Sequence, residues 1–129
     1  MRSAILHGAA ALAMFALVLT RAPDAGAATV LSTPFVPANN GQKLLCLATN
    51  VGSKPIQVTA ALFSVSGVAV TPLVDSCSSA PLPPMASCLV TFNDGCVCIV
   101  TSSSSKVRAD IVLLNGTTGA VEAVAPATK

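Results

Sequence analysis

The sequence contains no tryptophan and no tyrosine, and only 3% of its 129 residues are aromatic. Platforms on which sugars or nucleic-acid bases stack are built from aromatic rings, so a site of that kind is not expected. Charge is scarce as well, with 9% charged residues and a formal net charge of +2. Because Lys and Arg are not clustered, the sequence lacks the basic surface that binds nucleic acid or an anionic membrane.

The single histidine is His7, so residues 28–129 contain none. General acid/base catalysis near neutral pH needs histidine or a pair of carboxylates tuned by their surroundings. The sequence also has no Ser-His-Asp set, no glycine-rich phosphate loop and no metal-binding motif. We therefore expect no enzyme activity and no catalytic, cofactor-binding or metal-binding residues. The acidic residues beyond residue 27 are far apart in the sequence: Asp75, Asp94, Asp110 and Glu122.

The N-terminal segment has the parts of a secretory signal peptide. Arg2 precedes eleven consecutive apolar residues from Ala9 to Leu19, and Ala25 and Ala27 are small residues at the positions that signal peptidase reads. A buried helix would carry a polar face, which this run lacks, and a membrane span needs about 20 apolar residues. We expect removal of residues 1–27 as a signal peptide and a domain of residues 28–129 that is extracytoplasmic, periplasmic or secreted, without membrane contact after cleavage.

Hydrophobic residues make up 53% of the chain, which argues against disorder, and the length fits one domain. Apolar and polar residues alternate with a period of two, and no segment repeats apolar residues at helical spacing. Val107, Ala109 and Ile111, for example, alternate with Arg108 and Asp110. The pattern predicts an all-β domain with strands over residues 43–50, 56–63, 68–74, 86–92, 96–101, 107–114 and 119–124.

Turn signals separate the expected strands. Asn115-Gly116 predicts a tight hairpin because both residues tolerate positive φ. The prolines between Asp75 and Ala86 remove backbone donors, so this stretch is not a central strand and is expected to cross between sheets. About seven or eight short strands with this spacing predict an antiparallel β-sandwich, with a small barrel as the alternative.

Three parts of the chain follow one pattern: residues 45–58 with a cysteine-bearing strand and an Asn-Val-Gly turn, the corner Leu82-Pro83-Pro84, and Val107-Arg108-Ala109. The pattern resembles a group of small secreted bacterial proteins with an immunoglobulin-like β-sandwich. Met85 stands where that group has glycine, and the tryptophan of antibody-type domains is missing. The resemblance implies an immunoglobulin-like fold outside the cytoplasm and implies no activity.

All five cysteines, Cys46, Cys77, Cys88, Cys96 and Cys98, follow the expected signal peptide. In an oxidising compartment they predict two disulfides and one free thiol, in an arrangement that sequence alone leaves open. Cys96 and Cys98 should not bond each other, because their Cβ atoms would lie about 6.5 Å apart on one strand, beyond the roughly 4.5 Å that a disulfide allows. The sheet-to-sheet bridge of immunoglobulin-like domains implies that Cys46 joins Cys96 or Cys98, while Cys77 and Cys88 close the proline-rich corner.

Together these features predict an exported, non-enzymatic, disulfide-stabilised protein with a structural or binding role and an unknown protein or surface partner. The alternative is a thiol-redox or soft-metal protein for Cu or Zn that uses Cys96 and Cys98, with Met85 as a thioether donor, because thiolates two residues apart can chelate Cu(I) or Zn. Paired Cys-x-x-Cys motifs, which are typical of zinc sites and thiol oxidoreductases, are absent from the sequence. This absence favours the first prediction.

Overall fold

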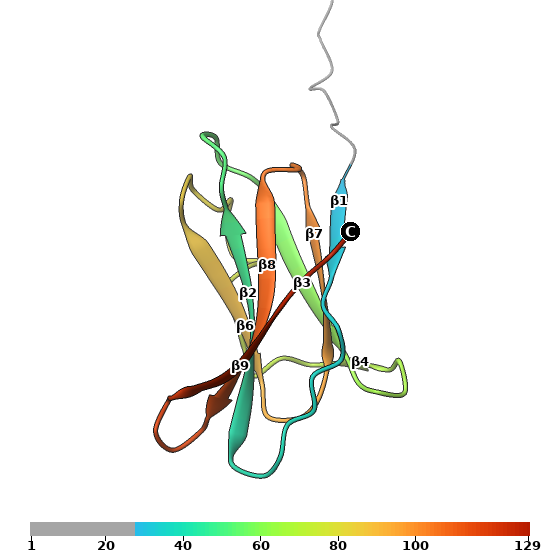
Figure 1. Ribbon diagram of the computed structural model, residues 1–129. Coiled ribbons are helices and arrows are strands. Elements are labelled where there is room, and N and C mark those ends of the chain that lie inside the picture. The colour runs from blue at the N-terminus through green and yellow to red at the C-terminus, as the bar shows by residue number, and fades with distance from the viewer. Residues whose placement is uncertain (1–27) are drawn as a thin grey trace, which may run out of the picture.

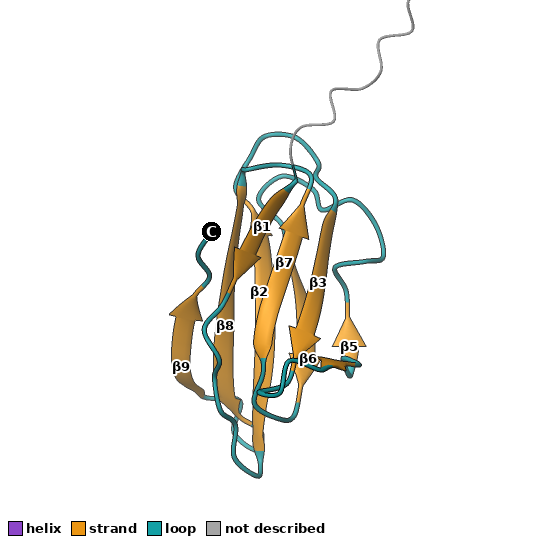
Figure 2. Ribbon diagram, turned by 90° about the vertical axis from the view of Figure 1, so that its right-hand side faces the viewer, coloured by secondary structure: helices purple, strands orange, loops and turns teal. Residues whose placement is uncertain are grey.

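The computed structural model describes residues 28–129, which form two antiparallel β-sheets and no helix (Figure 1). The expected signal peptide, with its cleavage residues Ala25 and Ala27, lies outside the described residues. Figure 2 shows β1, β7 and β3 in one layer with β2, β6 and β8 behind them. The strands are β1 (Thr29–Ser32), β2 (Gln42–Asn50), β3 (Val58–Phe63), β4 (Ala69–Val70), β5 (Val74–Asp75), β6 (Ser87–Phe92), β7 (Val97–Ser102), β8 (Val107–Asn115) and β9 (Val121–Pro126).

The four-stranded sheet has the order β1-β7-β3-β4 and the five-stranded sheet the order β5-β6-β2-β8-β9. This confirms the all-β, two-sheet prediction. The described residues contain nine strands where seven or eight were expected. One additional strand is β1, which the sequence pattern does not predict. The other arises because the strand expected over residues 68–74 is divided into β4 and β5 around Pro72, which has no amide hydrogen to donate to a neighbouring strand.

Alternating burial places the hydrophobic core between the two sheets. In β2, for example, Leu44 and Ala48 are buried, whereas the residues between them are partly exposed. The opposite sheet contributes Val58 and Val100, which are also almost completely buried. Burial of apolar side chains is the dominant stabilising contribution to folding, so this double layer holds the sheets together.

The proline-rich stretch and the last hairpin differ from the predictions. Residues 76–86 connect β5 to β6, which are neighbours in one sheet, so they do not cross between sheets; the crossing is made by residues 71–73. The β8–β9 loop is longer than a two-residue turn, and Gly119, at φ 72°, provides its left-handed residue. Gly116 instead allows close approach: its amide donates to the Gly41 carbonyl at 2.7 Å, and a Cβ at this position would collide with that oxygen.

One polar side chain, Asn50 at the end of β2, is completely buried. Its amide nitrogen donates to the carbonyls of Lys54, at 2.8 Å, and Leu82, at 3.0 Å. Its side-chain oxygen accepts the Gly52 amide hydrogen at 2.9 Å. Because buried amides are costly unless they are hydrogen-bonded, this residue fixes the turn after β2 against the proline-rich corner.

Candidate functional site

Two disulfides account for four of the five cysteines. Cys46 on β2 is bonded to Cys98 on β7, so this bridge joins the two sheets, with a Cα–Cα distance of 6.1 Å. Cys77 is bonded to Cys88, with a Cα–Cα distance of 4.9 Å, and closes the loop between β5 and β6. Cys96 is free and buried. This arrangement agrees with the pairing that the resemblance implied.

Cys96 is enclosed by the core and has no exposed surface. Its backbone pairs with that of Val36 just before β7 begins. Burial raises the pKa of the Cys96 thiol to about 11, and the negative charge of Asp94 adds to the effect. Since the thiolate is the form that attacks disulfides and binds metals, Cys96 is poorly suited to either reaction at neutral pH.

The residues suggested for thiol or soft-metal chemistry are not brought together as a site. Cys98 is already bonded to Cys46, and Cys96 is protonated at neutral pH. Met85, which is 76% exposed, donates its amide hydrogen to the carbonyl of Asn50 near the loop that follows β7, whereas Cys96 precedes β7 at the other end. Within residues 28–129, no three His, Cys, Asp or Glu side chains are grouped so that they could hold a metal ion.

The most unusual surface is the outer side of the five-stranded sheet, which faces away from the core. Strand register places Leu45 beside Val112, and Val112 beside Val124, in one row across three strands. An antiparallel sheet that faces water normally has polar residues on that side. Here most of the outward residues in the middle of the sheet are aliphatic, although Thr91 and Asp110 also lie there. We call the aliphatic surface the outer face: Leu45, Leu47, Leu89, Val112, Leu114 and Val124.

Neighbouring side chains on the outer face cover one another. Val112 is only 7% exposed although it points away from the core, because its strand neighbours flank it. Val124, on the edge strand, is 58% exposed. Polar residues border the aliphatic centre: Lys43 lies at one end of β2, and the hydroxyls of Thr49 and Ser87 are 2.8 Å apart at the other end. An apolar centre with a polar rim is typical of a protein–protein interface.

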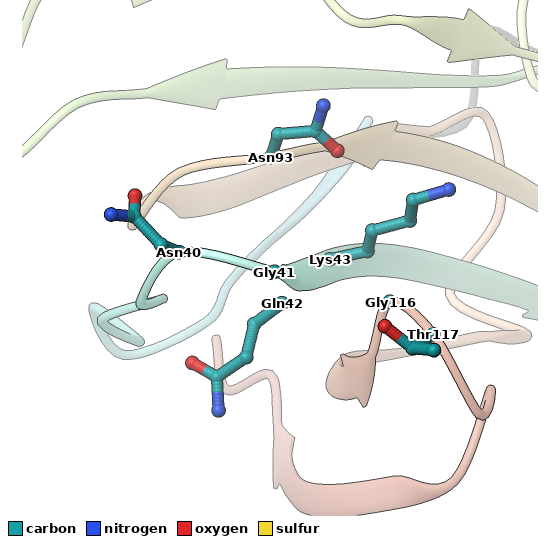
Figure 3. Close-up of a pocket in the computed structure, with 7 residues that line it drawn as sticks. All are labelled: Asn40, Gly41, Gln42, Lys43, Asn93, Gly116 and Thr117. Carbon is teal, nitrogen blue, oxygen red and sulfur yellow. The ribbon is translucent and has the colours of Figure 1, made fainter.

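A second feature is an open pocket of about 330 Å³ where β2 begins (Figure 3). Figure 3 shows the side chains of Asn93 and Lys43 on one side of the chain and Gln42 on the other. Gln42 is occupied by hydrogen bonds with Glu122 and with the Asn39 amide. The pocket therefore offers neutral amides and one lysine, a set that favours hydrogen bonding to a polar group. Its full lining is Asn40, Gly41, Gln42, Lys43, Asn93, Gly116 and Thr117.

Comparison of the chain with protein-family models, with curated proteins and with solved structures finds no match. In the part of the chain that the structure describes, no helix is long and apolar enough to cross a bilayer.

Sequence reasoning missed the outer face, although β2 contains a signal for it. Residues 44–48 are an unbroken apolar run, whereas a strand with one face in water should alternate. A continuous apolar run indicates that a strand has apolar surroundings on both sides. Leu45 and Leu47 form the outward half of this run.

Proposed function

We propose that the protein is an exported, non-enzymatic, immunoglobulin-like β-sandwich whose cysteines stabilise the fold and whose activity is to present a surface to a protein or surface partner. The bond between Cys46 and Cys98 is the observation that carries this proposal. It commits Cys98 to joining the sheets. The remaining thiol is enclosed and resists ionisation.

Export is supported by the two disulfides together with the N-terminal sequence. Disulfides within a small domain indicate an oxidising environment, and they form and persist in extracellular and periplasmic proteins. The apolar run from Ala9 to Leu19 and the small residues Ala25 and Ala27 provide the signal for that route.

The thiol or soft-metal function would require two changes in the described residues. Cys98 would have to leave its bond with Cys46, and Cys96 would have to become exposed and lose its proton. Each change opposes the packing that surrounds these residues, so the structural role is favoured.

The test is to express the full chain in a bacterium, separate the cell fractions and measure intact mass before and after reduction. We expect the mass of residues 28–129, lowered by the hydrogens lost in forming two disulfides, and one thiol that is alkylated only after unfolding. A protein that retains residues 1–27 and stays in the membrane fraction would contradict export.

The same preparation tests the chemical alternative. We expect no dithiol reductase activity and no bound metal after incubation with Cu(I) or Zn. One metal equivalent per chain, or reductase activity that is lost in Cys98→Ser and kept in Cys88→Ser, would overturn the proposal in favour of thiol or metal chemistry. The second variant is the matched control because it breaks the bridge that lies away from Cys96.

A further inference from the structure

The outer face extends across most of the five-stranded sheet. Leu47 lies between Leu89 on β6 and Asp110 on β8, and the row beside it joins Leu45 to Val112 and Val124. Contiguous apolar surface of this kind on a charge-poor domain marks a place where another molecule packs. We propose that the outer face packs against the same face of a second copy of this chain, giving a two-fold symmetric dimer.

The charges on the face fit a second copy better than a partner with one sign of charge. Arg108 and Lys43 lie near the two ends of the face, and Asp110 lies between them, all at outward positions. In a two-fold interface every residue occurs on both sides, so each copy offers an acid to the bases of the other. A strongly acidic partner would leave Asp110 unpaired and a strongly basic partner would leave both bases unpaired, whereas a second copy leaves one base of each copy without an acid.

The size of the face also fits self-association. Strands lie about 4.8 Å apart and outward residues about 6.6 Å apart along each strand, so the about fifteen outward residues of the whole sheet, polar ones included, cover roughly 500 Å². Two copies would bury roughly 1,000 Å² in total, about the smallest area of a specific interface. We therefore expect a dimer that dissociates in the micromolar range.

The edge of the sheet favours face-to-face packing over strand addition. Pro126 on the edge strand β9 has no amide hydrogen to donate. Just beyond it, Thr128 already exchanges two backbone hydrogen bonds with Ser32, at 2.8 and 2.9 Å. The free edge is therefore shortened at the C-terminal end of β9, while twisted sheets pack readily face to face.

The experiment is sedimentation velocity on the purified exported protein over about 1 µM to 1 mM. We expect a monomer–dimer equilibrium with half-dimerisation between about 1 and 100 µM. The double variant Leu47→Lys/Leu89→Lys places two like charges at the centre of the face and should weaken dimerisation at least about 100-fold. The matched control is Ile99→Lys, at an outward, partly exposed position of the other sheet, and it should leave the equilibrium unchanged.

Backbone amide signals recorded by NMR at low and high concentration give a second readout that needs no variant. We expect concentration-dependent shifts at Leu45, Leu47 and Val112, and none at Thr59 and Ala61 on the opposite sheet.

A monomer up to 1 mM, an equal effect of the control variant, or shifts confined to the opposite sheet would overturn the dimer. Shifts on the outer face that appear when residues 1–27 are attached, and do not change with protein concentration, would overturn the dimer and show that this segment covers the face. Failure of the dimer with export and both bridges intact would leave the proposed function standing.

Discussion

Cys96 lies two residues before Cys98 and faces the same core, yet only Cys98 is bonded, to the strand of the opposite sheet. The spacing explains the difference. Inward positions on one strand are about 6.6 Å apart, too far for a disulfide between them, so each cysteine depends on what faces it across the core. Cys98 faces Cys46. The chain therefore uses its cysteine pair to join two sheets and leaves one thiol enclosed.

Removing the two disulfides should have unequal effects. The Cys46–Cys98 bridge spans 52 residues and the Cys77–Cys88 bridge spans 11. The chain-entropy model assigns about 4 kcal/mol to the longer loop and about 3 kcal/mol to the shorter one. Cys46→Ala/Cys98→Ala should therefore lower Tm by roughly 15–30 °C, and Cys77→Ala/Cys88→Ala by less. Calorimetry of the two variants checks the order, and an equal or reversed order would contradict the account.

Cys96 should make the domain sensitive to alkaline pH. Its folded-state pKa of about 11 is above the ordinary value of 9.0, so from pH 9 to 11 the unfolded chain loses a proton that the folded chain keeps. The contribution of this thiol to the free energy of unfolding is thus fully present below pH 9. It falls by up to about 2 kcal/mol as the pH rises to 11. Urea unfolding at several pH values measures the fall. Cys96→Ala should remove this component, and a variant with the same alkaline slope as the natural chain would disprove the assignment.

Asn50→Ala should be strongly destabilising. The substitution removes three hydrogen bonds and leaves the Lys54 carbonyl and the Gly52 amide without this partner, while the Leu82 carbonyl keeps only the Ile56 amide. We expect a loss of about 3 kcal/mol or more in the free energy of unfolding. The control is Asn115→Ala, whose oxygen accepts two backbone amides on an exposed loop and should cost about 1 kcal/mol. Similar losses in urea unfolding would show that the buried network is not important.

Met85→Gly should stabilise the domain. Met85 has φ 59° and its side chain is 76% exposed, so a non-glycine residue occupies the left-handed region without burying its side chain. Because glycine adopts this conformation without strain, the substitution should raise the free energy of unfolding by about 1 kcal/mol and Tm by roughly 4–8 °C. Met85→Ala keeps a Cβ and is the matched control, for which no rise is expected. A rise of the same size in both variants would assign the effect to the side chain.

The sequence predicts the parts of the fold that depend on local alternation. The alternation of Val107, Ala109 and Ile111 with polar residues correctly places β8 with one side in the core. The positive φ of Met85 is not predicted by its residue type, because this conformation is usually adopted by glycine. Asn115-Gly116 correctly marks the hairpin turn between β8 and β9, but this short motif does not reveal the Gly41 carbonyl, which approaches Gly116 from a distant part of the chain.

Other features depend on long-range pairing. The four residues of β1 gain their partners from β7, 67 to 73 residues later, and their own pattern is too short to indicate a strand. The outer face depends on the register of β6, β2 and β8. Leu89, Leu47 and Val112 are each a single apolar residue of a kind that many strands contain. Only their alignment on one side makes them a surface.

The structural role of the cysteines is tested most directly by mapping the unreduced protein after alkylation of free thiols in denaturant. A protease that cleaves before aspartate cuts at Asp75, Asp94 and Asp110, so Cys46, the pair Cys77 and Cys88, and the pair Cys96 and Cys98 fall in three separate fragments. The account predicts that the first and third fragments are linked through Cys98, that the middle fragment is closed on itself, and that alkylation marks Cys96 alone. A link from Cys46 to the middle fragment, or alkylation of both Cys96 and Cys98, would contradict it.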